Sequence, residues 1–413
     1  MTRFHGFPGR ACRYLIIAAA WIACTTALDA EPPAGYYDTV DLSSPPALQT
    51  SLHEIIDDHI RTPLSSPNSW LILESAEQDP NDPDQILDIY KNQTYLKVGG
   101  GTGGYEREHT WPQSYGFPKD TGSGRYPRSD YHALFLADGS YNGSRGFTLY
   151  RTCAETNCAE WPTLFNNGRG GGAGVYPGNS NWRRGTGATG TWETWIGRRG
   201  EVARALFYLD TRYDGSDHAD GSAEPNLVLT NDPLLIASDS ATNKDPAYMG
   251  ILSVLLKWHY EDPVDEVERG RHEAIFAAQG NRNPFIDHPE WVACVYQGVC
   301  GADTALLLNG GRFKITALWT TSQGTSGLGR PQQLTNDTGY FWFFADTNVE
   351  VVIKVLNGCV VNDRFWVFAG GLTNVEVMIT IEDTKSGQVR RYTNSQGAAF
   401  RPIQDTNAFS TCP

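Results

Sequence analysis

The chain has 413 residues, of which 40% are hydrophobic, 12% aromatic and 19% charged, and its formal net charge is −14. This composition can bury a sizeable core, which excludes a wholly disordered chain, a collagen and a coiled coil. A length of 413 residues favours two domains over a single core.

The first thirty residues have the pattern of a secretory signal peptide. Arg3, Arg10 and Arg13 precede an apolar run from Tyr14 to Ala27, and small residues follow up to Ala30. The run is shorter than the ~18 residues that a membrane-spanning helix needs. We therefore predict cleavage after Ala30, secretion to the periplasm or the extracellular space, and no membrane span in the mature chain.

Six cysteines remain after such a cleavage, and an even number in an exported chain favours three disulfides. Several pairings are open, and closeness in the sequence favours Cys153–Cys158, Cys294–Cys300 and Cys359–Cys412. A zinc site is the weaker alternative, because the cysteines have no CxxC spacing and no histidine at ligand spacing beside them.

Helical periodicity dominates the predicted elements up to Cys300. Apolar residues recur about every 3.6 positions in four segments, residues 46–61, 201–213, 247–260 and 264–278. The acidic segment 76–85 predicts a solvated turn, with a calcium loop as the weaker alternative because EF-hand spacing is absent. Residues 99–200 are rich in glycine and show little periodicity, which predicts a loop-dominated stretch that carries function.

The apolar period changes from 3.6 to 2 after Cys300. Residues 313–319 and 375–381 alternate apolar and polar side chains, which is typical of half-buried strands. The sequence of residues 347–353 nearly recurs at 373–379, which predicts two similar strands of one sandwich. We therefore predict a separate antiparallel β domain at residues 301–413, after a mainly helical domain at residues 31–300.

Two aromatic runs of this β region have two possible roles. Residues 339–344 and 364–368 could form an exposed recognition strip, or they could fill the core of the sandwich. Burial is the favoured interpretation, because aromatic side chains dominate cores as well as interfaces. The binding partner of the β domain is not predicted.

Arginine is concentrated in the middle of this acidic chain. Residues 101–200 contain eleven Lys and Arg against eight acidic residues, and ten of the eleven are Arg. The planar guanidinium group can bind two phosphate oxygens at once. This segment is therefore a candidate for binding phosphate groups, with an ordinary solvated surface as the alternative.

Glu108 and His109 form a candidate chemical pair in the same segment. A carboxylate is a hard oxygen ligand for a cation, and an imidazole can take a proton near neutral pH. Adjacent residues of a strand point to opposite faces, so a metal site and a base could flank one backbone position. Asn142 supplies a further oxygen, and Arg145 would share its face of a helix.

Three ordered motifs together resemble the endonuclease I family of secreted and periplasmic nonspecific nucleases. They are Glu108-His-Thr-Trp-Pro-Gln-Ser114, Asp130-Tyr-His-Ala-Leu134 and Asn142-Gly-Ser-Arg145. The resemblance extends over residues 46–300, and it includes segments 200–208, 258–264 and 279–291. Members of this family carry a ββα-metal active site, also called a His-Me finger.

The resemblance implies an α+β nuclease domain and a role for five residues. Glu108 and Asn142 would bind one Mg²⁺-type cation, for which Mn²⁺ or Ca²⁺ are alternatives, and His109 would be the general base that activates water. Arg145 and Arg128 would bind the phosphate, although a structural salt bridge is an equal alternative for Arg128. The substrates implied are DNA and RNA, and we expect a monomer.

The chain departs from the family pattern beside the proposed ligand, at Ala133 and at Gly146-Phe147. We expect altered loop packing there and retained metal binding. Asp130, His132 and the segment 279–288 are expected to support loops rather than to bind metal.

Two alternatives to the metal-dependent nuclease stay open at this point. The first is a secreted binding or adhesion protein in which the nuclease-like domain is inactive and the β domain does the binding. The second is a zinc hydrolase that uses His109, Asp130 and His132, and it has less support than the first.

Overall fold

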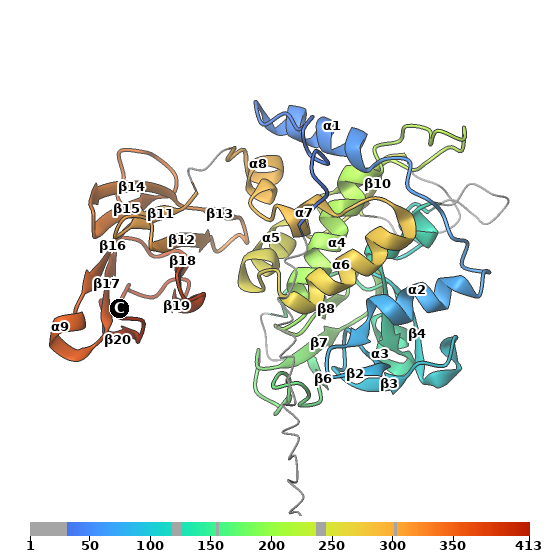
Figure 1. The fold of residues 1–413 in the computed structure, drawn as a ribbon, viewed down its shortest axis with the longest axis horizontal. Helices are drawn as coiled ribbons and strands as arrows, with labels where there is room; N and C mark the ends of the chain where they lie inside the picture. Colours follow the sequence, from blue (N-terminus) through green and yellow to red (C-terminus); the bar gives the residue numbers. More distant parts are fainter. Residues whose placement is uncertain (1–30, 118–125, 154–156, 237–244, 301–303) are drawn as a thin grey trace, which may run out of the picture. The chain divides into compact units, whose positions relative to one another are not determined.

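The computed structural model describes residues 31–117, 126–153, 157–236, 245–300 and 304–413 (Figure 1). The predicted signal peptide, residues 1–30, lies outside the described residues. The fold combines helices and strands before Cys300 and is rich in β-strands after it. Among the described residues, no helix is long and apolar enough to cross a membrane.

The four predicted helices are present with shifted ends. They are α1 (Pro45–Ile56), α4 (Arg199–Arg212), α5 (Leu252–Glu261) and α6 (Glu266–Gln279). Ser44 caps α1, and the helix ends before Asp58, whose positive φ of 57° is not helical. Residues 247–249 form a strand instead of the first turn of α5. The other helices are α2 (Asn68–Ala76), α3 (Gly139–Arg145), α7 (Pro284–Asp287), α8 (Trp291–Gln297) and α9 (Cys359–Asn362).

The N-terminal part contains ten short strands among the described residues as well as helices, so the expectation of a mainly helical domain is not confirmed. They form small sheets, mostly antiparallel, with the orders β1-β2-β3, β4-β5 and β6-β7-β8 and one parallel pair, β9-β10. Their bounds are β1 Gln78–Asp79, β2 Asp82–Leu87, β3 Thr94–Leu96, β4 Tyr105–His109, β5 Leu134–Asp138, β6 Ala159–Pro162, β7 Ser180–Arg184, β8 Thr191–Glu193, β9 Leu227–Leu229 and β10 Ala247–Met249.

Two segments predicted without regular structure belong to these sheets. The acidic segment 76–85 lies largely in the β1-β2 pair, and residues 99–200 contain β4 to β8 together with α3. Short strands gave no clear period in the sequence, because a run of three to five residues is too brief to establish one.

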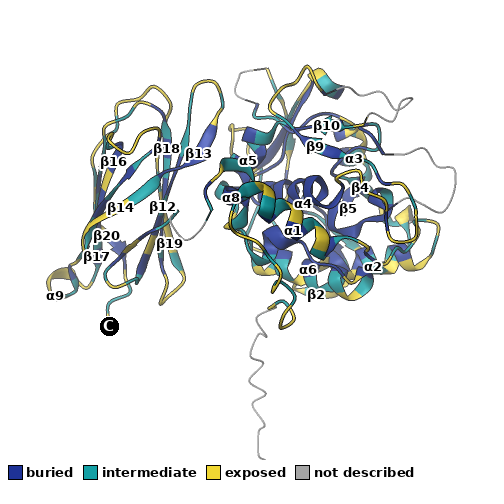
Figure 2. Cartoon of the chain, turned by 90° about the horizontal axis from the view of Figure 1, so that it is seen from above, coloured by how far each residue is buried: buried dark blue, intermediate teal, exposed yellow. Residues whose placement is uncertain are grey.

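Helix α4 is the centre of the N-terminal core. All its residues are buried, and it appears almost wholly dark blue in Figure 2. Its apolar side chains join one hydrophobic cluster with residues of α1, α5 and α8. Its buried arginines pair with carboxylates, as Arg204 does with Glu268 at 2.5 Å. A buried charge is tolerated only with such a partner.

The C-terminal part consists of two antiparallel sheets around a core of its own. The orders are β11-β12-β18-β19, with β13 also paired to β12, and β14-β15-β16-β17-β20. The bounds are β11 Leu306–Leu308, β12 Phe313–Thr320, β13 Ser326–Leu328, β14 Arg330–Thr335, β15 Thr338–Trp342, β16 Val351–Asn357, β17 Phe365–Gly371, β18 Glu376–Asp383, β19 Gln388–Asn394 and β20 Ile403–Phe409. This architecture fits the predicted sandwich, and the repeated sequences fall in β16 and β18, one in each sheet.

The aromatic runs of this part divide between the two faces of one sheet. Phe341 and Phe365 are buried in the core, whereas Tyr340, Trp366 and Phe368 are only partly buried. Side chains of a strand alternate between its faces, so neighbouring aromatics separate. Burial is therefore the correct interpretation for about every second residue of these runs.

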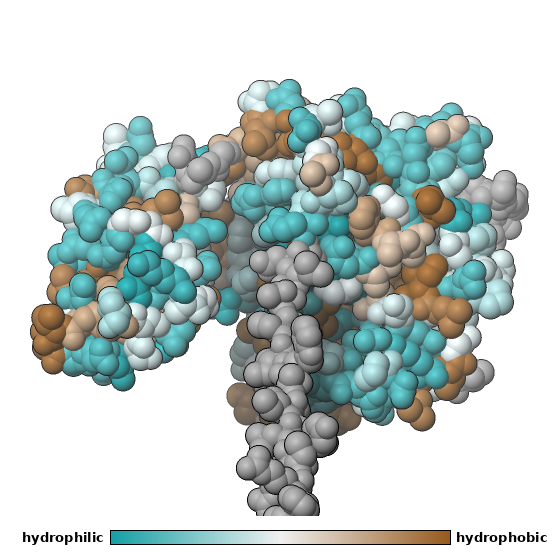
Figure 3. Space-filling view, in the orientation of Figure 1, coloured by the Kyte–Doolittle hydropathy of each residue, from teal (hydrophilic) through white to brown (hydrophobic). Residues whose placement is uncertain are grey.

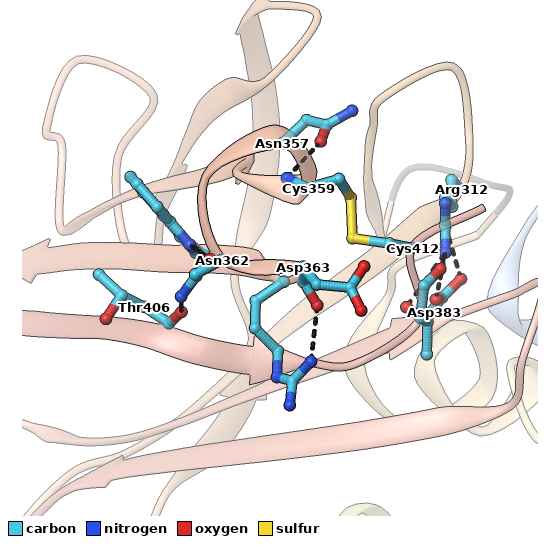
Figure 4. Close-up of a disulfide and its surroundings, with 11 residues drawn as sticks. Arg312, Asn357, Cys359, Asn362, Asp363, Asp383, Thr406 and Cys412 are labelled. Atoms are coloured by element: carbon cyan, nitrogen blue, oxygen red, sulfur yellow. Dashed lines mark hydrogen bonds and ion pairs between the residues drawn. A yellow bond between two sulfur atoms is a disulfide. The ribbon is translucent and has the colours of Figure 1, made fainter.

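The three favoured disulfides are present: Cys153–Cys158, Cys294–Cys300 and Cys359–Cys412. The last closes 53 residues of the C-terminal part and attaches the chain end to α9 (Figure 4). In Figure 3, hydrophobic colour gathers at the tip formed by α9, where Val360 and Val361 are 98% and 69% exposed.

Candidate active site

The candidate site is built on β4, β5 and α3. The strands pair in antiparallel register, with Glu108 opposite Phe135 and His109 opposite Leu134. Asp138 ends β5 and caps α3, because its carboxylate accepts a hydrogen bond of 2.8 Å from the backbone N–H of Ser140. The three elements lie side by side (Figure 2). This order of two strands and a helix brings His109 and Asn142 to one region.

Strand β4 places the predicted pair at the border of two pockets. One, of about 230 Å³, is lined by Glu108 and Asn142. The other, of about 440 Å³, is lined by Arg128. Arg107 and His109 line both, so the pockets adjoin at β4. Glu108 and His109 therefore both line the smaller pocket, and His109 also lines the larger one.

The His109 ring is positioned by hydrogen bonds on both nitrogens. Its Nε2 lies 2.9 Å from the carbonyl oxygen of Arg128. A carbonyl only accepts, so Nε2 carries the proton and Nδ1 has the lone pair. The side-chain amide of Gln113 lies 3.2 Å from Nδ1. Burial lowers the pKa of His109 to about 4, so the ring is neutral at neutral pH and can accept a proton.

Glu108 is a buried carboxylate with one oxygen engaged. It is 2% exposed, and its Oε1 accepts a 2.6 Å hydrogen bond from the Tyr90 hydroxyl and lies 3.2 Å from Nη1 of Arg145. Burial raises the pKa of Glu108, and the positive charge of Arg145 opposes this rise. Among the described residues, no hydrogen bond or ion pair engages Oε2.

Asn142 lies on the first turns of α3 with its amide nitrogen in use. Its Nδ2 donates to Glu106 Oε2 at 3.2 Å and to the carbonyl oxygen of Arg107 at 3.4 Å. Its carbonyl oxygen and the carboxylate of Glu108 are hard oxygen donors that line one pocket, which fits a hydrated Mg²⁺-type cation. The described residues include no group of three His, Cys, Asp or Glu side chains that could hold a metal ion.

Arg145 lies beneath the site, which differs from the expected contact with a phosphate. It is 1% exposed, and its guanidinium donates to the carbonyl oxygens of His109 at 2.9 Å and Thr110 at 2.6 Å. The same group pairs with Glu108. These contacts use the guanidinium to fix the end of β4, and Arg145 lines neither pocket.

Asp130 and His132 belong to a buried support network. Asp130 accepts hydrogen bonds from Tyr208, Tyr213 and Gln279, and His132 Nε2 lies 3.0 Å from the carbonyl oxygen of Asn281. The expected supporting role is confirmed, because Gln279 also accepts from the backbone N–H of Tyr131. The zinc alternative, which needs these side chains together with His109, is not supported.

Several residues of the site were not predicted from the sequence. Tyr90 reaches Glu108 from a segment 18 residues away, and no pattern around it indicated this contact. Arg61 lies beyond the end of α1 and lines the larger pocket. Gln113 lies within the recognised motif and Arg107 directly precedes it, so their closeness to the motif was the feature of the sequence that could have indicated them.

Comparison with known proteins identifies the class as a nuclease. The family model described as Endonuclease I matches residues 45–290. An extracellular ribonuclease of Bacillus amyloliquefaciens is 36% identical over 259 residues, which cover 62% of this chain and 76% of that protein. The extracellular ribonuclease of Bacillus subtilis (strain 168) has the same identity and coverage.

The chain belongs to the endonuclease I family and is an endonuclease, an enzyme that hydrolyses nucleic acid. The matched range contains every residue of the candidate site and ends before the C-terminal β part.

Proposed function

We propose that the protein is a secreted, metal-dependent endonuclease that cleaves RNA and DNA with little sequence selectivity. The observation that carries the proposal is the fixed tautomer of His109, whose basic Nδ1 lies beside a pocket with two hard oxygen donors. Secretion is supported by the three disulfides and by relatives that are named extracellular ribonucleases.

Five residues of the site would have distinct roles in the hydrolysis. His109 takes a proton from the attacking water through Nδ1, while the Arg128 carbonyl keeps the ring oriented. Glu108 and Asn142 would hold the cation, and Arg145 would keep the end of β4 and the Glu108 carboxylate in place. When bound, a Mg²⁺-type ion neutralises developing charge on the phosphate and on the leaving oxygen.

The kind of contact that the site offers favours a broad range of nucleic-acid substrates. The groups of the site are a cation site, an imidazole and arginines, and these groups recognise phosphates rather than bases. Phosphate contacts position a nucleic acid without reading its sequence. The relatives are named ribonucleases, which supports RNA as a substrate, and DNA is proposed because the phosphodiester group is the same.

The test is cleavage of supercoiled plasmid and of single-stranded RNA by residues 31–413, with Mg²⁺ and with chelator. We expect degradation of both with Mg²⁺ only, and a fall of about 10² to 10⁴ for His109→Ala. His288→Ala is the matched control, because this ring is partly exposed and lines neither pocket. Full activity of a folded His109→Ala protein contradicts the mechanism, and inactivity of the wild type with several divalent metals favours a binding protein.

A further inference from the structure

Phe147 is an exposed aromatic side chain at the smaller pocket of the candidate site. It is 45% exposed and lines this pocket together with Glu108, His109 and Asn142. Apart from the His109 imidazole, it is the only aromatic ring in the described lining of either pocket. An exposed ring beside a phosphate site is suited to stacking on a nucleobase.

The Phe147 ring is held in place by a glycine of the short 3₁₀ helix Gly187–Thr189. Gly187 has a positive φ of 66°, and a Cβ atom at this position would lie 2.7 Å from Cε2 of the ring. The edge of the ring therefore packs closely on the glycine backbone. The Tyr115 hydroxyl also donates a hydrogen bond of 2.9 Å to the carbonyl oxygen of Phe147. A ring fixed in this way loses little entropy when a base stacks on it.

Two arginines flank the strand that follows this 3₁₀ helix. Arg184 ends β7, which pairs with one edge of β8, and Arg151 lies in the segment that is hydrogen-bonded to the other edge. Nη2 of Arg151 donates to the carbonyl oxygen of Ala188 at 3.2 Å, next to the glycine that supports Phe147. Burial lowers the pKa of Arg151, and the positive charge of Arg184 adds to this shift, so the two guanidinium groups repel each other.

The charges of Arg151 and Arg184 are not cancelled by carboxylates. Within the described ranges neither guanidinium forms an ion pair, whereas the buried Arg199 and Arg204 are paired with glutamates. Neither residue lines either pocket, so both lie outside the groups proposed for the scissile phosphate. A bound phosphate would relieve the repulsion between them, and in a chain with a net charge of −14 they provide a local attraction for a polyanion.

We infer that Phe147, Arg151 and Arg184 bind the single strand that adjoins the scissile phosphate, with one base stacked on the ring and a following phosphate held by the two arginines. We call these three side chains the strand-binding surface. The inference rests on the proposed function, which places the scissile phosphate beside Glu108 and Asn142 in the pocket that Phe147 lines.

The strand-binding surface favours single-stranded nucleic acid. A base must leave the double helix before it can stack on Phe147, and a duplex keeps its bases paired. Every base has a π face, so stacking adds affinity without selecting a sequence. The surface therefore specifies the form of the substrate and agrees with the low sequence selectivity of the proposed function.

The test of Phe147 is fluorescence anisotropy of labelled 12-mers with residues 31–413 in chelator, with the length of each oligonucleotide verified on a gel. The ligands are a single strand, the corresponding duplex and a strand of abasic sites with the same phosphates. We expect the wild type to bind the base-bearing strand about ten-fold more tightly than the abasic strand. Phe147→Leu keeps an apolar contact with Gly187 but has no π face, so this ratio should fall below about two-fold with unchanged affinity for the duplex. Phe147→Trp should retain the ratio.

The test of the arginines is the dependence of the same binding on salt. Arg151→Gln and Arg184→Gln should weaken binding of the base-bearing and abasic strands equally, and each should lower the magnitude of the slope of log K against log salt by about 0.7. Phe165→Leu is the matched control for Phe147, because Phe165 is 74% exposed and lines neither pocket. Arg401→Gln, at an exposed position of the C-terminal part, is the control for the arginines. Thermal unfolding checks the fold of each variant.

Three results would overturn the inference: a wild type that binds the base-bearing and abasic strands equally, a Phe147→Leu protein that keeps the full ratio or loses duplex affinity to the same extent, and unchanged salt slopes in both arginine variants. Failure of the proposed function is a different result. A wild type that shows the ratio dependent on Phe147 but cleaves nothing with several divalent metals contradicts only the proposed function. A wild type that cleaves with Mg²⁺ but shows no such ratio contradicts only the inference.

Discussion

The tautomer of His109 is decided by a single backbone carbonyl, that of Arg128. Because Arg128 also lines the larger pocket beside His109, one residue both orients the His109 ring and forms part of that pocket's wall. A substitution of the Arg128 side chain should therefore leave the orientation of the His109 ring intact. This separation explains how a short 3₁₀ helix can serve two purposes.

At the residue scale, Asn142→Ala should weaken cation binding without unfolding the protein. The change removes one of two proposed oxygen ligands, so we expect the Mg²⁺ concentration for half-maximal cleavage to rise by about ten-fold or more. A magnesium titration of initial rates measures this. Ser144→Ala, on the same helix, is the control because Ser144 lines neither pocket. An unchanged titration midpoint for Asn142→Ala would remove Asn142 from the cation site.

At the scale of elements, the β4-β5-α3 unit depends on Arg145. Arg145→Gln leaves the buried Glu108 carboxylate without its cationic partner and shortens the donor that reaches the carbonyl oxygens of His109 and Thr110. We expect a loss of about 3–5 kcal/mol in the free energy of unfolding, measured with urea. Arg145→Lys keeps the charge and should lose less. Wild-type stability of Arg145→Gln together with a raised KM would instead favour the phosphate contact predicted from the sequence.

The packing of α4 and α6 around His132 predicts a pH dependence of stability. Burial lowers the pKa of His132 to about 3, with help from His272 and Arg271, while Asp130 and the Asn281 carbonyl oppose the shift. The imidazole of His132 therefore binds a proton below pH ~6.5 in the unfolded chain, but only below pH ~3 in the folded chain. The contribution of His132 to stability is complete above this window and is lost as the pH falls through it.

The measurement is the slope of the unfolding free energy against pH between 4 and 5.5. One such proton contributes about 1.4 kcal/mol per pH unit, with stability increasing as pH rises. His132→Asn should lower the slope by about this amount. Comparison with the wild type is needed because burial raises the pKa of Asp88 to about 7, which contributes with the opposite sign. Equal slopes for the two proteins would contradict a neutral, buried His132.

At the scale of the whole molecule, the two cores should respond separately to loss of a disulfide. Cys359–Cys412 joins residues 53 apart, so its removal should cost up to about 4 kcal/mol of stability in the C-terminal part. The double substitution Cys359→Ser and Cys412→Ser should leave cleavage at 25 °C intact, because the candidate site lies within residues 45–290. Thermal unfolding and plasmid cleavage test both outcomes.

Cys294–Cys300 is the matched comparison, since it joins residues only six apart and its removal should cost about 2 kcal/mol. Loss of nuclease activity in the folded Cys359→Ser and Cys412→Ser protein would show that the C-terminal part supports the site. The boundary near residue 300 stays a prediction until such a measurement is made.

The sequence by itself determined the family, the identity of Glu108, His109 and Asn142 as candidates and the strands of the C-terminal part, and it favoured the disulfide pairing that the structure shows. These depend on local spacing and on period, which a chain displays without folding. Only the tertiary structure decided that Arg145 is a buried support, that Arg61 joins Arg107 and Arg128, and that Tyr90 reaches Glu108. Each of these depends on contacts between distant segments, because the direction and burial of a side chain follow from packing and not from its neighbours in the sequence.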